Sequence, residues 1–153
     1  MTLKHILTAL ALSTVATGAL AGPAVTITFK NLGQKDVTYQ PIGKNENETY
    51  ANAAPKPIKV VKAQSSDTYL VSSPLSPDVN YAFVRYTDGA RQCELRTTFV
   101  NVPKPGGLLN NGVIPKVPQW NKTATGSGGA FCNAEITYYN MATLEWSVEF
   151  TMR

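Results

Sequence analysis

The side chains that most often carry out catalysis are scarce in this chain. Its single histidine, His5, lies within residues 1–21. This segment has the basic Lys4 close to its beginning, then an apolar run, and then small residues that fit an A-x-A cleavage site. These features predict a secretory signal peptide. Its removal leaves no histidine, which excludes His-activated serine and cysteine nucleophiles, histidine general bases and His-containing zinc sites.

Paired carboxylates could still hydrolyse a glycoside without histidine. Glu94 and Glu135 are the acidic residues that we place inside strands near the cysteines. Their spacing does not indicate that they approach one another, and alternation puts each on the polar face of its strand, which favours a solvated role. The run NENET at 45–49 offers oxygen atoms but lacks the spaced acidic pattern of an EF-hand. We therefore predict no metal and no cofactor.

The only two cysteines, Cys93 and Cys132, both follow the predicted cleavage site. In an oxidising compartment such a pair is expected to form one disulfide. Closing a ring of about 40 residues would stabilise the fold by about 4 kcal/mol in the chain-entropy description. The sequence thus predicts an exported protein, secreted or periplasmic.

The charge balance argues against a nucleic-acid partner. Loss of Lys4 lowers the formal net charge from +4 to +3, and no run of lysine or arginine concentrates it. The N-terminal apolar run is shorter than the roughly 20 residues that a membrane-spanning helix needs, and no later stretch reaches that length. We expect a soluble, exported chain.

Period-two alternation of apolar and polar residues recurs along the chain and predicts an all-β protein. The segment from Gly43 to Pro57 is polar and is predicted as a loop. Because short strands alternate with turn signals, we predict an antiparallel two-sheet β-sandwich that forms one domain over residues 22–153. About eight strands are expected, at 25–30, 37–42, 58–63 and 68–73, on both sides of Asp88-Gly89, at 131–139 and at the C-terminus.

The dipeptide Asp88-Gly89 predicts a hairpin with a type I′ turn that pairs Val84 with Cys93. The buried face of this hairpin would carry Ala82, Val84, Cys93, Leu95, Thr97 and Phe99. The opposite face would present Tyr81, Phe83, Arg85 and Arg96, and exposed aromatic and arginine side chains are common at binding hot spots. The alternative for these four residues is ordinary cross-strand pairing on a solvated sheet.

Residues 103–130 hold four of the ten prolines and six of the eleven glycines, and we predict that they form a long loop. This loop also carries apolar side chains: Leu108, Leu109, Val113, Ile114 and Trp120. They could close one end of the sandwich, form an exposed contact patch, or belong to a disordered segment. Composition does not separate these possibilities.

Three functional hypotheses follow from the residues. The first is an exported, non-enzymatic binding module that recognises a protein or a glycan, with the 103–130 loop as its contact element. The second is a membrane-active or lipid-binding protein that inserts the apolar residues of that loop into a membrane surface. The third is a small histidine-free hydrolase that uses paired carboxylates.

Overall fold

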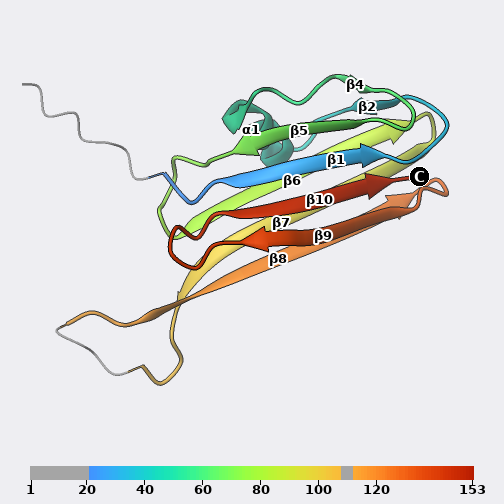
Figure 1. Cartoon of the computed structure of the whole chain (residues 1–153). Coiled ribbons are helices and arrows are strands. Elements are labelled where there is room, and N and C mark those ends of the chain that lie inside the picture. The colour runs from blue at the N-terminus through green and yellow to red at the C-terminus, as the bar shows by residue number, and fades with distance from the viewer. Residues whose placement is uncertain (1–20, 108–111) are drawn as a thin grey trace, which may run out of the picture.

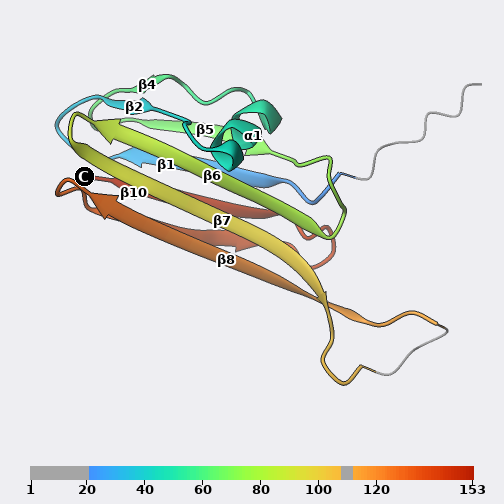
Figure 2. The ribbon, with the colours of Figure 1, turned by 180° about the vertical axis from the view of Figure 1, so that it is seen from behind.

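Two five-stranded sheets face one another in the computed structural model, which describes residues 21–107 and 112–153 (Figures 1 and 2). The first sheet has the order β3 (Ala53–Ala54), β5 (Ser66–Val71), β1 (Val25–Asn31), β10 (Trp146–Met152) and β9 (Cys132–Tyr139). The second has the order β4 (Val60–Val61), β2 (Val37–Tyr39), β6 (Val79–Asp88), β7 (Arg91–Pro103) and β8 (Lys116–Ser127). The predicted sandwich is confirmed, although the described residues form ten strands and not eight.

Alternating residues of both sheets fill the space between them, as the period-two pattern predicts. On β10, Trp146, Val148, Phe150 and Met152 are all at least 99% buried. Aromatic contacts join the two sheets: Phe29 of β1 stacks on Tyr86 of β6 with ring centroids 3.5 Å apart. The indole of Trp146 donates a hydrogen bond to the hydroxyl of Thr97 across the core at 2.9 Å. A buried polar atom is thereby satisfied at the centre of the apolar layer.

Strands β1 and β10 pair in parallel, with Ile27 beside Val148, whereas the other strand pairs are antiparallel. These two strands lie near opposite ends of the chain, so no short turn constrains their direction. Alternation identifies the buried face of a strand but not its neighbour or its direction, and the sequence therefore could not reveal this pair.

The β6–β7 hairpin turns at Gly89 and Ala90 and not at Asp88 and Gly89. Gly89 has a φ of +59°, while Ala90 keeps a negative φ, as in a type II′ turn. Val84 therefore pairs with Leu95, and the predicted register is wrong by two residues. Because a shift of two leaves every side chain on its original face, the predicted buried face is nevertheless observed.

The segment predicted as a loop after Gly43 contains a helix, α1 (Lys44–Asn52). Glu46 caps its N-terminus, since one carboxylate oxygen accepts hydrogen bonds from the backbone N–H groups of both Ile42 and Gly43 at 2.7 Å. This is the acidic half of a capping box. At the other end, the ammonium of Lys56 donates to the carbonyl oxygens of Tyr50 and Ala51. These capping contacts compensate for a helix with few apolar residues.

The loop predicted over residues 103–130 is largely strand, because residues 116–127 form β8 along the whole of β7. Pro118, the proline inside β8, is tolerated since β8 is an edge strand, where one side of the backbone needs no ladder partner. The predicted disulfide is present: Cys93 of β7 joins Cys132 of β9 with Cα atoms 5.7 Å apart. It ties one sheet to the other.

Candidate functional site

Strands β8 and β9 are the edges of different sheets and lie on the same side of the sandwich (Figure 1). A short turn at 128–131 connects them, with the Ala130 N–H donating to the Ser127 carbonyl at 3.1 Å. Within the described residues neither strand has a pairing partner on its outer side. The sandwich is therefore open along the line between these two edges.

The register shows which side chains face this opening. On β8, Trp120 lies opposite the buried Phe99 and Ala124 lies opposite the buried Leu95, so both point to the inner side of the sheet. On β9, Ile136 lies opposite Val148. The inner rows of the two edge strands thus meet along the open side of the sandwich.

A groove of about 450 Å³ lies between the edges, and we call it the β8–β9 groove. Trp120 forms its floor: the indole stacks on Tyr139 with ring centroids 5.1 Å apart and donates a hydrogen bond to the Leu144 carbonyl. These contacts fix the tryptophan in one orientation. The groove is lined by Val117, Pro118, Trp120, Ile136, Tyr139 and Met141.

Large apolar side chains around the groove remain open to solvent. Met141 is 62% exposed, Tyr139 56% and Val117 38%. Scattered exposed apolar residues are normal on a protein surface, whereas a group around a concave site is typical of a binding surface. Of the side chains predicted for a contact element, Trp120 contributes directly to this groove.

The β7–β8 hairpin continues past the rest of the sandwich as an arm, as Figures 1 and 2 show. Its base is fixed by Asp78, which accepts a hydrogen bond from Asn101 at 3.1 Å and forms an ion pair with Lys116. Toward its tip, Val113 is 67% exposed and Ile114 44%. The predicted site residues Leu108 and Leu109 lie outside the described residues.

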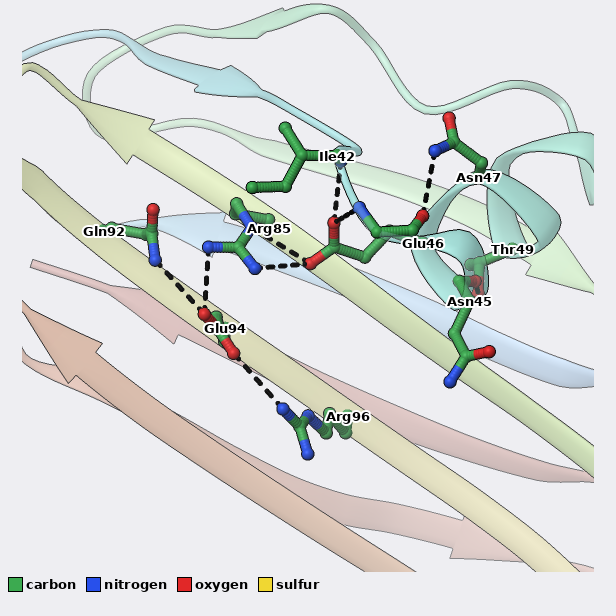
Figure 3. Close-up of polar contacts among 10 residues, drawn as sticks. Ile42, Asn45, Glu46, Asn47, Thr49, Arg85, Gln92, Glu94 and Arg96 are labelled. Carbon is green, nitrogen blue, oxygen red and sulfur yellow. Dashed lines mark hydrogen bonds and ion pairs between the residues drawn. The ribbon is translucent and has the colours of Figure 1, made fainter.

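The predicted hairpin surface is partly covered by α1. Arg85 is bound to Glu46 of the helix through two guanidinium nitrogens at 3.0 Å and to Glu94 at 2.9 Å, and only 13% of its side chain is exposed. Glu94 also pairs with Arg96 at 3.2 Å (Figure 3). A chain of alternating charges therefore runs from the helix to β7.

This network lowers the pKa of Glu46 below the ordinary value. Burial raises the pKa, but the N–H groups of Gly43 and Ile42 and the guanidinium of Arg85 outweigh it because they stabilise the carboxylate. Nearby, Tyr81 donates a hydrogen bond to Glu48, and burial together with this contact raises the tyrosine pKa to about 12.

Of the four residues predicted for the hairpin surface, Tyr81 and Arg85 are thus engaged by α1. Arg96 remains half exposed and lies over the ring of Phe83, with the guanidinium carbon 5.3 Å from the centroid. A hollow of about 310 Å³ separates these two from the start of α1. Its carboxylates, Glu46 and Glu94, are already paired with arginines, and the Glu46–Arg85 pair holds the helix to the sheet.

Glu94 and Glu135 do not form a carboxylate pair. Glu94 lies on the outer side of the second sheet beside Arg85, whereas Glu135 lies opposite Glu149 on the outer side of the first sheet. Both sheets and the single core between them separate the two carboxylates. The arrangement that the hydrolase hypothesis requires is therefore absent for these two residues.

Sequence reasoning missed the β9 side of the groove. Strict alternation places Tyr138 inward, but β9 shifts register at Thr137, so that Tyr139 lies opposite the buried Trp146 and faces the groove. A bulge of one residue exchanges the faces of all the residues that follow it. Met141, in the connection to β10, carries no periodic signal either.

No protein-family model matches the chain, and no curated protein matches it. Within the described residues, no helix is long and apolar enough to cross a membrane.

Proposed function

We propose that this protein is an exported binding module that holds an extended, apolar segment of a partner protein in the β8–β9 groove. The observation that carries the proposal is a concave apolar surface between two unpaired strand edges, with Trp120 fixed at its floor. The arm beside it would enlarge the contact area. Export is supported by the Cys93–Cys132 disulfide, since such bonds persist in oxidising compartments.

The lining of the groove favours a protein over a glycan. A sugar ring presents hydroxyl groups around its edge, and each one buried without a hydrogen-bond partner costs free energy. Among the groove side chains the Tyr139 hydroxyl is the one clear partner of this kind, because the others are aliphatic, a thioether or the indole of Trp120, whose N–H is already used. Apolar side chains from an extended segment need no partners, and the backbone of that segment could pair with a free strand edge.

Selection from a random peptide library displayed on phage tests the proposal on the oxidised protein. Enriched peptides should contain apolar residues at alternate positions, because those side chains would enter the groove from an extended backbone. They should lose most of their binding to the double variant Val117→Thr/Met141→Thr. The matched control is Ile58→Thr/Leu75→Thr, which removes two similarly exposed apolar side chains away from the groove.

Equal loss of binding in both double variants, or enrichment of peptides without apolar residues, would contradict the proposal. The exposed Val113 and Ile114 of the arm favour a lipid surface as the second candidate. Co-sedimentation with liposomes that falls on Val113→Asp but not on Met141→Thr would support that candidate instead.

A further inference from the structure

One charged side chain interrupts the apolar inner row of β8. Lys122 lies opposite Thr97, whose side chain is fully buried and faces the core, so Lys122 also points to the inner side of the sheet. Along the same row its neighbours are Trp120 and Ala124. Residues two apart in a strand are separated by about 7 Å, so Lys122 stands next to Trp120 in this row, just beyond the residues that line the β8–β9 groove. It also borders a second, smaller hollow beside Phe83 and Arg96.

The Lys122 ammonium has no counter-ion among the side chains that the structure describes, since no carboxylate there lies within ion-pair distance of it. The acidic residue on β9, Glu135, points to the outer face of the first sheet, where its cross-strand neighbour Glu149 pairs with Lys30 at 2.7 Å. The other side chains on the facing row, which are Cys132, Ala134, Ile136 and Tyr139, carry no charge.

We infer that the segment bound in the groove carries a carboxylate that pairs with Lys122, next to the apolar side chain that contacts Trp120. This inference rests on the proposed function and specifies the chemistry of its partner. A lysine beside a partly desolvated groove favours an acidic partner and opposes a basic one, because a like charge placed there would find no counter-ion.

The same side chain would oppose indiscriminate pairing at this edge. An inward-pointing lysine discourages an unrelated apolar strand from adding to an edge strand, because its charge would be buried without a partner. Pro118, which has no N–H group, has a similar effect on β8. A segment with a correctly placed carboxylate removes the first of these two obstacles, so that Lys122 both protects the edge and selects its partner.

A charge exchange tests the inference with the same displayed peptide library. Peptides enriched on the unmodified protein should carry Asp or Glu within two residues of an apolar position. Their affinity, measured by calorimetry with the synthetic peptide, should fall about tenfold on Lys122→Glu. Replacement of the acidic residue of the peptide by lysine should then restore binding to Lys122→Glu and to no other variant. Lys35→Glu, an exposed lysine outside the groove, is the matched control.

The possible outcomes separate this inference from the proposal beneath it. Apolar peptides that are lost on Val117→Thr/Met141→Thr, but lack an acidic residue and bind Lys122→Glu equally well, would overturn the inference alone. Peptides insensitive to the groove variant would overturn both. An equal loss of affinity in Lys122→Glu and Lys35→Glu would show a general charge effect and would also overturn the inference.

Discussion

The hydroxyl of Thr49 on α1 accepts the backbone N–H of Phe83 on β6 at 2.9 Å and donates to the Asn45 carbonyl at 2.8 Å. Strand β2 ends at Tyr39, so the edge of β6 beyond that point has no strand beside it. The helix takes the place of the missing strand, and a side-chain oxygen supplies the acceptor that a neighbouring backbone would have supplied.

Replacement of Thr49 by valine should therefore lower the free energy of unfolding by about 1–3 kcal/mol, because the shape of the side chain is kept while the Phe83 N–H loses its acceptor. Urea denaturation followed by tryptophan fluorescence measures this change. Thr49→Ser retains the hydroxyl and should lose much less. An equal loss in both variants would mean that the methyl group, and not the hydrogen bond, is the important contact.

Two arginines that share Glu94 should differ strongly in their effect on stability. Arg85→Met leaves the buried Glu46 without its guanidinium, and we expect a loss of about 3 kcal/mol. Arg96→Met removes a half-exposed ion pair and should cost less than about 1 kcal/mol. Chemical denaturation of the two variants under the same conditions checks the ordering, and similar losses would contradict it.

The lowered pKa of Glu46 predicts a dependence of stability on pH. Folding lowers the pKa of the Glu46 carboxyl below its ordinary value of 4.5. Glu46 therefore stabilises the folded state fully above that pH, and this stabilisation is lost as the pH falls through the lower pKa of the folded state. Thermal unfolding between pH 3 and pH 7 should show a smaller decline for Glu46→Gln than for the unmodified protein. Parallel curves for the two proteins would be inconsistent with this role.

The disulfide should contribute about 4 kcal/mol to the free energy of unfolding, since it closes a ring of about 40 residues. The double variant Cys93→Ala/Cys132→Ala removes it without leaving a free thiol. We expect a lower denaturation midpoint with an unchanged fold, as judged by circular dichroism. Because Cys132 anchors the start of β9 to β7, amide hydrogen exchange in β9 should also become faster. A stability equal to that of the oxidised protein would contradict the prediction.

The local alternation of apolar and polar residues identifies the buried face of most strands without reference to their neighbours. Trp146, Val148 and Phe150 alternate with polar residues, and alternation follows directly from the pleat of a strand, whatever lies beside it. The predicted faces of β6 and β7 are correct even though their predicted pairing register is wrong, since a shift of two residues moves no side chain to the other face. The cysteine pair was likewise predictable, because the chain offers only one pairing.

The local sequence pattern did not predict two elements, α1 and β8, for different reasons. Helix α1 has few apolar residues, and it is held by Glu46 and Thr49 through contacts with residues at least 34 positions away on β6. Strand β8 contains Pro118 and glycine, which argue against a strand unless one of its sides is free. In both cases the deciding contact is long-range.

The sequence by itself determined that this chain forms β-strands with one buried face, a single disulfide and no histidine after residue 21. Tertiary structure alone decided that Trp120 and Tyr139 would meet, because they belong to the edges of different sheets and a bulge at Thr137 turns the tyrosine inward. The position of Lys122 beside them was decided in the same way. A side chain's face is a local property of its strand, whereas a groove between two edges exists only after all the other strands have paired.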